Sequence, residues 1–204
     1  RGQAQTSKRT VQATQVAAGV YMVEGEAALG SSANRNFISN AGFIVTGAGV
    51  VVVDALGSPA LAHELIAEIR RITPEPITHV VVTHFHADHI YGLQVFKQIG
   101  AQILAHPAAR DYLHSDTARL RLVQSRIDFF PWVDETTQLT PATQWLADPE
   151  TTLRVGARTL RIKHVGPAHT AEDLVVFDTA SGVLFSGDIV YRGRIPFVGQ
   201  ADSG

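Results

Sequence analysis

Three histidines and an aspartate stand within six positions of the chain, at His84, His86, Asp88 and His89. They directly follow residues 78–83, whose β-branched side chains are typical of a strand that is covered on both faces. Residues two apart in an extended backbone point the same way, so His84 and His86 can bind one metal ion together. Asp88 and His89 come next, at the expected start of a helix, and can face a second ion. The pattern predicts a metal site at a strand end, in preference to a chance cluster of surface histidines.

The composition limits which ligands and partners are available. The 204 residues include nine histidines and no cysteine, which excludes disulfides, thiolate nucleophiles and metal sites held by cysteine. A formal net charge of −2 argues against nucleic-acid binding through bulk positive charge, and the 45% hydrophobic content suits a folded core. No apolar run approaches the roughly 18 residues of a membrane span. We expect a small-molecule substrate, no nucleic acid and no membrane span, with the oligomeric state left open.

The elements that position these residues are predicted by short apolar runs and turn residues. Strands are expected at four such runs in the first half, residues 20–23, 43–45, 50–53 and 102–105. Ser58 and Pro59 suit the N-cap and the first position of a helix that ends near residue 73, and a second helix is expected to run from the histidine cluster to about Ile99. The alternation of strands and helices predicts an α/β sheet with helices packed on it.

The second half is expected to add a helical segment and two hairpins. Residues 107–130 contain apolar positions at helical spacing, which we expect to be buried while four arginines form the solvated face. These apolar positions are Leu120, Val123 and Ile127. The remaining strand-like runs predict hairpins of 152–155 with 159–164 and of 174–177 with 183–185. No closing helix follows them.

The N-terminal stretch, residues 1–15, is polar and without periodicity, so we expect a flexible lead-in followed by one domain over 16–204. Such a stretch is common just after a removed export signal, which favours a periplasmic or exported protein over a cytoplasmic one.

Residues 83–89 (THFHADH) resemble the HxHxDH signature of the metallo-β-lactamase superfamily, in the expected context of an apolar strand and a following helix. Two further landmarks of that family occur in the same order. Residues 166–170 (GPAHT) resemble its glycine–histidine–threonine turn, which contains His169, and residues 186–188 (SGD) resemble its strand-end Gly-Asp, which contains Asp188. The resemblance implies a four-layer αββα sandwich.

Carried over residue by residue, the resemblance implies two metal ions. The first ion is held by His84, His86 and His169, and the second by Asp88, His89 and a bridging Asp188. The family's last histidine of the second site comes later in the chain, and no histidine follows His169 here. We therefore expect a domain that lacks its C-terminal end, and the tail at 194–203 is similar to the quinoprotein relay system zinc metallohydrolases.

The resemblance further implies a dinuclear zinc hydrolase, with iron or manganese as lesser options. A metal-bound hydroxide would attack a carbonyl substrate (a lactam, lactone, ester or thioester), and Asp88 would orient the nucleophile and pass a proton to the leaving group. The absence of cysteine excludes the β-lactamase subclass that uses a thiolate ligand. The alternatives are a mononuclear iron enzyme similar to persulfide dioxygenases, a nuclease, and an incomplete metal-binding scaffold without catalysis.

Other residues leave two interpretations open each. Asp54 is either a partner of a ligand histidine or a helix-entry turn residue, and Asp173 is an equally open candidate to orient His169. His164 and His106 are expected to be packed, non-ligand residues. The tryptophans in the loop-rich stretch 130–149, Trp132 and Trp145, either wall a pocket or cover a core edge.

Overall fold

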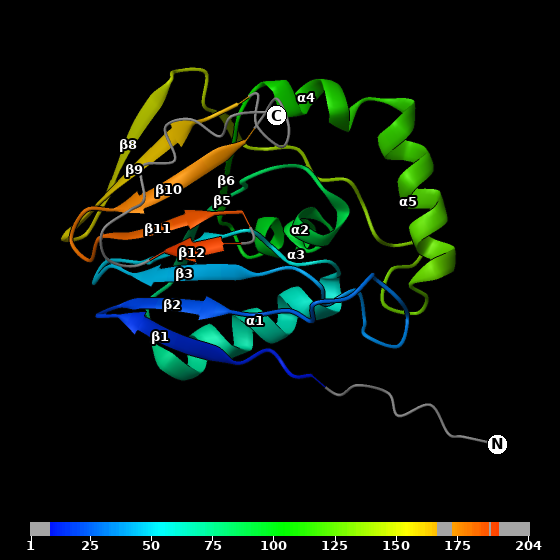
Figure 1. Ribbon diagram of the computed structural model, residues 1–204, viewed down its shortest axis with the longest axis horizontal. Helices are drawn as coiled ribbons and strands as arrows, with labels where there is room; N and C mark the ends of the chain where they lie inside the picture. The colour runs from blue at the N-terminus through cyan, green and yellow to red at the C-terminus, as the bar shows by residue number, and fades with distance from the viewer. Residues whose placement is uncertain (1–8, 167–172, 188, 192–204) are drawn as a thin grey trace.

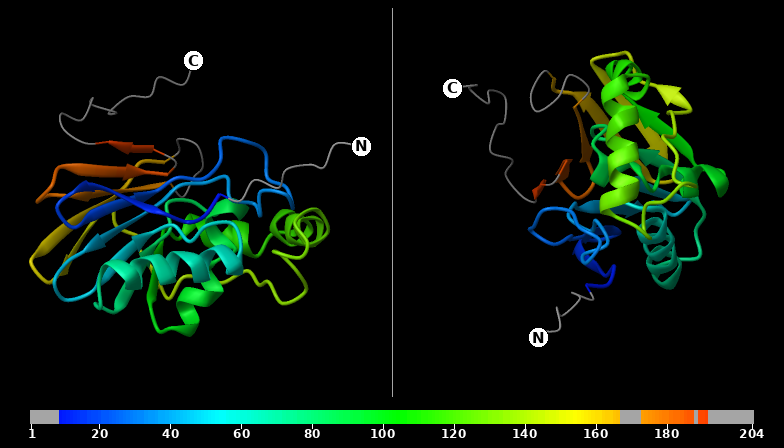
Figure 2. Two further views of the ribbon diagram at one scale, coloured as in Figure 1. Left: turned by 90° about the horizontal axis from the view of Figure 1, so that it is seen from below. Right: turned by 90° about the vertical axis from the view of Figure 1, so that its right-hand side faces the viewer.

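Two β-sheets pack face to face, and helices cover the outer face of the larger one (Figures 1 and 2). The structure is a computed structural model that describes residues 9–166, 173–187 and 189–191. The described helices are α1 (Pro59–Ile72), α2 (Ala87–Ile90), α3 (Leu93–Gln98), α4 (Ala108–Leu113) and α5 (Asp116–Asp128). Within the described residues, no helix covers the outer face of the smaller sheet. The expected α/β architecture of packed sheets and helices is confirmed.

The larger sheet has seven strands and the smaller has five. In spatial order the larger contains β1 (Ala13–Ala17), β2 (Val20–Val23), β3 (Ala41–Val45), β4 (Val50–Val53), β5 (Ile77–Val81), β6 (Gln102–Ala105) and β7 (Gln144–Trp145). The smaller contains β12 (Ile189–Tyr191), β11 (Val183–Ser186), β10 (Leu174–Asp178), β9 (Arg158–His164) and β8 (Glu150–Val155). Strands β1 to β4 are antiparallel, whereas β4 to β7 are parallel, so the C-terminal ends of β4, β5 and β6 meet at one edge.

The four valines of strand β4 pack into two different hydrophobic cores. All four of its residues are buried, and because side chains alternate along a strand, Val50 and Val52 join the helix-side core. Val51 and Val53 join the core between the two sheets. A continuous apolar run is therefore what this position requires.

The first helix forms where its capping residues predict. The Ser58 hydroxyl accepts a hydrogen bond from the Leu61 amide (3.2 Å), and Pro59 occupies the first turn. The second expected helix is divided into α2 and α3, with Gly92 at the break. A Cβ atom on Gly92 would lie 2.0 Å from the carbonyl oxygen of Ala55, so glycine allows this turn to pack against the chain that leaves β4.

The orientation expected for helix α5 is wrong. Leu120, Val123 and Ile127 are 56%, 44% and 68% exposed. The opposite face is buried instead. It contains two small side chains and one large apolar one: Ala118, Ser125 and Leu122. Three hydrogen bonds hold this face against the rest of the fold. The Tyr91 hydroxyl meets the Ser125 hydroxyl at 3.1 Å, and the Arg126 guanidinium donates to the carbonyls of Asp134 and Thr137.

Strand β1 begins at Ala13, three residues before the boundary expected at residue 16. The Ala13 amide donates to the Glu68 carboxylate of α1 (3.0 Å), and Val11, two residues before the strand, is buried. The division into a lead-in at 1–15 and a domain at 16–204 stays a prediction. Strands β7 and β12 have no counterpart among the expected elements, because two or three residues are too short to show a strand pattern.

Candidate metal centre

The four residues of the histidine cluster lie together just beyond the end of β5. His84 and His86 occupy the extended link between β5 and α2, whereas Asp88 and His89 lie in α2. The ring centroids of His84 and His86 are 4.6 Å apart, and those of His84 and His89 are 4.1 Å apart. The structure therefore brings together four of the six predicted ligands.

Asp54 organises this cluster from the end of the neighbouring strand β4. It is fully buried, and its carboxylate accepts hydrogen bonds from the Thr83 amide (2.8 Å), the Thr83 hydroxyl (2.7 Å) and Nδ1 of His89 (3.0 Å). The Thr83 hydroxyl oxygen lies 3.0 Å from Nδ1 of His84. The structure makes Asp54 a hydrogen-bond partner of His89, one of the predicted ligands.

This network assigns the same tautomer to two imidazoles. The Asp54 carboxylate can only accept, so the Thr83 hydroxyl and Nδ1 of His89 must donate to it. The hydroxyl then accepts from Nδ1 of His84. In the neutral form of both rings the hydrogen is on Nδ1 and Nε2 is the acceptor atom, which is how a metal-ligating histidine is held by its other ring nitrogen.

The backbone at Asp54 is strained. Its φ angle is +66°, in the left-handed region that residues other than glycine rarely adopt, and Leu56 shares this value. Strain of this kind persists only where surrounding contacts over-determine the conformation, and it clusters at functional sites. Here the three hydrogen bonds of the buried carboxylate supply those contacts.

The electrostatics keep His84 neutral and Asp88 ionised. Burial lowers the pKa of His84 to about 4, and the neighbouring His89 contributes to the lowering. Burial raises the pKa of the Asp88 carboxyl, but the protonated form of the His89 ring, which donates from Nε2 as well as from Nδ1, outweighs burial and lowers that pKa. Neutral imidazoles and an ionised carboxylate are the protonation states in which these groups bind a metal ion.

The Asp88 and His89 side chains fit a cation between them. Oδ2 of Asp88 lies 3.3 Å from Nε2 of His89. Two ligands of one tetrahedral zinc ion, each bound at about 2.0–2.1 Å, lie about 3.3 Å apart. Two acceptor atoms this close need a proton or a cation between them, and imidazole with carboxylate is a donor set that suits zinc.

The remaining predicted ligands, His169 and Asp188, lie outside the described residues, as do most of the turn at 166–170 and the tail at 194–203. In the part of the chain that the structure does describe, no group of three or more His, Asp or Glu side chains is arranged to hold a metal ion.

The structure also places three other residues that the sequence left open: Asp173, Trp145 and Trp132. Asp173 is buried, and its charge favours the protonated form of His84. Trp145 packs on the helix-side core and carries the Arg110 guanidinium 4.9 Å from its ring centroid. The Trp132 indole nitrogen donates to the carbonyl of Ser32 (2.9 Å).

Two residues that touch this centre give no signal in the sequence. Thr83 links Asp54 to His84, although the sequence presents it only as the last residue of an apolar run. Ser39 lies in the long link between β2 and β3, and its hydroxyl donates to the carbonyl oxygen of Asp88. Thr83 bonds to Asp54 29 positions away, and Ser39 bonds to Asp88 49 positions away, so only the folded chain reveals these contacts.

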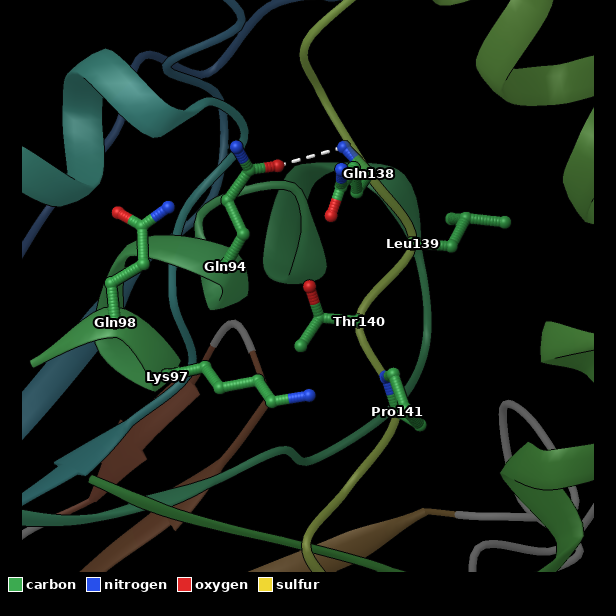
Figure 3. A pocket seen from close by; sticks show the side chains of 7 residues that line it. All are labelled: Gln94, Lys97, Gln98, Gln138, Leu139, Thr140 and Pro141. Atoms are coloured by element: carbon green, nitrogen blue, oxygen red, sulfur yellow. Dashed lines mark hydrogen bonds between the residues drawn. The ribbon is translucent and has the colours of Figure 1, made fainter. Parts of the chain in front are cut away.

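A surface hollow of about 410 Å³ lies between α3 and residues 138–141, and it contains none of the predicted ligands (Figure 3). Gln94 spans it by accepting a hydrogen bond from the amide of Gln138 (2.7 Å).

Among the described helices, none combines the length and apolar character needed to cross a membrane.

Comparison with known proteins agrees with this architecture. The sequence model described as "Metallo-beta-lactamase superfamily" matches residues 34–203. The chain is 25% identical over 168 residues to the metallo-beta-lactamase type 2 of Elizabethkingia meningoseptica, a match that covers 81% of this chain and 59% of that protein. It is 42% identical over 48 residues to the linear primary-alkylsulfatase of Pseudomonas sp. (strain ATCC 19151), covering 24% of this chain and 9% of that protein.

Solved structures give the same fold. The metallo-beta-lactamase from Pontibacter korlensis superposes with a TM-score of 0.63 and 18% sequence identity, covering 87% of this chain and 71% of that one. The chain thus spans about three fifths of the curated β-lactamase that it matches. Because the family model matches residues 34–203, the chain belongs to the metallo-beta-lactamase superfamily.

Proposed function

We propose that the protein is a dinuclear zinc hydrolase of a carbonyl substrate. The observation that carries the proposal is the tautomer assignment by Asp54, which turns Nε2 of both His84 and His89 into acceptor atoms beside an ionised Asp88.

In this proposal one ion is held by His84, His86 and His169, and the other by Asp88, His89 and Asp188. Bound zinc supplies Lewis-acid activation of water and of the substrate carbonyl. The Asp88 carboxylate, ionised at neutral pH, accepts the proton of the attacking water and returns it to the leaving group. Asp54 and Thr83 keep the imidazoles in the tautomer that binds metal.

Substitution of Asp88 tests the proposal. Asp88→Ala should abolish turnover across a panel of lactams, lactones, esters and thioesters, and Asp88→Asn should retain some metal but lose turnover, because an amide cannot accept the proton. Unimpaired hydrolysis by Asp88→Ala would refute the assignment. The exposed Asp116 on α5 provides a matched control, and Asp116→Ala should leave turnover unchanged.

Sulfate-ester hydrolysis is a second candidate. Its support is the 48-residue stretch that is 42% identical to the linear primary-alkylsulfatase, a higher identity than the longer match to the β-lactamase has. A primary alkyl sulfate belongs in the same substrate panel. Turnover of that compound without turnover of any carbonyl compound would favour this candidate over the first.

A further inference from the structure

Two histidines outside the predicted ligand set join the two sheets at the edge that carries the candidate metal centre. His106 directly follows β6 of the larger sheet, and His164 ends β9 of the smaller sheet. Their rings stack with centroids 3.7 Å apart and planes 10° from parallel. The Ala108 amide donates to Nδ1 of His106 (3.1 Å). The stack is a direct van der Waals contact between the ends of strands from different sheets.

A second tie between the sheets lies beside it. Leu174 begins β10 and is the register partner of His164 in β9. Its amide donates to the carbonyl oxygen of Thr83 (2.8 Å), the same residue that links Asp54 to His84. The Val165 amide donates to the carbonyl oxygen of Asp173 (3.1 Å), which closes the base of the segment between the two strands.

His164 and Leu174 are therefore the positions at which the chain leaves and re-enters the smaller sheet, and each is tied to the larger sheet. In the sequence, the predicted ligand His169 falls between them. Ligands of one zinc ion must converge to about 2.0–2.1 Å from it, so the spacing of the two sheets at this edge controls whether both sets of ligands can reach the same ion.

We propose that His106 is a positioning residue of the metal centre. Its stack on His164 holds the end of β9 against the larger sheet, as the hydrogen bond between Thr83 and Leu174 holds the start of β10. The inference rests on the proposed function, because the stack has this role only if residues of the smaller sheet's side complete the metal site.

Zinc affinity and hydrogen exchange of the full-length protein test the proposal. Zinc dissociation constants are measured by competition with a chromogenic chelator for His106→Ala, His164→Ala, the double variant and His106→Phe, which keeps a flat ring but no ring nitrogen. The alanine variants should each bind zinc about 10-fold more weakly, in the range for residues that support metal ligands. The double variant should be no weaker than either single one, and His106→Phe should stay within about 3-fold of the parent.

Exchange in the metal-free protein gives a readout that does not depend on zinc. The amides of Val165 and Leu174 should exchange faster in His106→Ala than in the parent, because both hydrogen bonds lie at the base that the stack holds. His63→Ala is the control, since His63 is an exposed histidine of α1 and should change neither readout.

Three results would overturn the proposal. In the first, both alanine variants bind zinc at the parent's affinity. In the second, the losses of zinc affinity in the two single variants multiply in the double variant. In the third, His106→Phe binds zinc as weakly as His106→Ala, which would assign the effect to a ring nitrogen. If the parent itself binds no zinc, the proposed function fails, whereas the exchange data still decide whether the stack holds the base of the segment. If His106→Ala does not fold, His164→Ala and His106→Phe carry the same comparison.

Discussion

Replacing the Asp54 carboxylate by an amide perturbs the tautomer assignment on which the metal centre depends. The amide introduced by Asp54→Asn would keep one acceptor oxygen, which can still bind the Thr83 amide, but its NH₂ group would face the Thr83 hydroxyl and Nδ1 of His89. His89 would then accept at Nδ1 and carry its hydrogen on Nε2, the atom proposed to bind metal. We expect zinc affinity to fall about 10- to 100-fold.

The same substitution lowers stability by an amount that the hydrogen bonds set. Two of the three bonds to the carboxylate lose their acceptor, and each bond to a charged group contributes about 1.5–3 kcal/mol. The Thr83 hydroxyl and the His89 ring can reorient to accept from the new amide, which recovers part of this energy. We expect the metal-free variant to unfold with a free energy about 2–3 kcal/mol lower, measured by denaturant unfolding.

Asp178→Asn is the matched control for Asp54→Asn. Asp178 is also fully buried, and its carboxylate accepts from the Arg158 guanidinium (2.6 Å) and the Ser181 amide (3.2 Å), at the end of β10 opposite to Leu174. We expect a comparable loss of stability with unchanged zinc affinity. Zinc affinity of Asp54→Asn equal to that of the parent, or lowered equally in both variants, would refute the reasoning.

Three further predictions concern pH, packing and the exposed helix face. Burial holds the pKa of His84 near 4, below its ordinary 6.5, so on acidification the unfolded chain takes up a proton at this residue before the folded chain does. The metal-free protein should therefore lose up to about 3 kcal/mol of its unfolding free energy between pH 6.5 and 4. The His84→Gln variant should lose less, and a variant with the same pH profile as the parent would contradict the prediction. Gly42→Ala should destabilise the protein by about 1–3 kcal/mol in denaturant unfolding, because the added Cβ would lie 2.1 Å from the Phe185 ring of the other sheet; no measurable loss would be inconsistent with the close approach of the sheets. Ile127→Lys on α5 should change stability by less than about 0.5 kcal/mol, and a loss of several kcal/mol would mean that this face is covered.

The sequence predicts the histidine cluster well because its information is local. Spacing alone places His84 and His86 on one side of an extended backbone and puts Asp88 and His89 in the next turn. The caps of α1 are equally local, since Ser58 bonds to an amide three residues away. Both expectations agree with the structure for this reason.

The sequence fails where tertiary contacts decide. On α5, the pattern of Leu120, Val123 and Ile127 predicts the wrong buried face, because the hydroxyl of Tyr91 and the smallness of Ala118 and Ser125 select the other one. The role of Asp54 depends on partners 29 and 35 positions away, so its two interpretations are equal until the chain is folded. The stack of His106 on His164 joins different sheets and has no local signal at all.

The metal content of the protein, purified without chelators, tests the central claim most directly. Elemental analysis together with titration of the metal-free protein should give two zinc ions per chain, with fewer ions in His86→Ala and no hydrolysis by Asp88→Ala. A chain that binds no metal, or that holds one iron and consumes oxygen, would contradict the account.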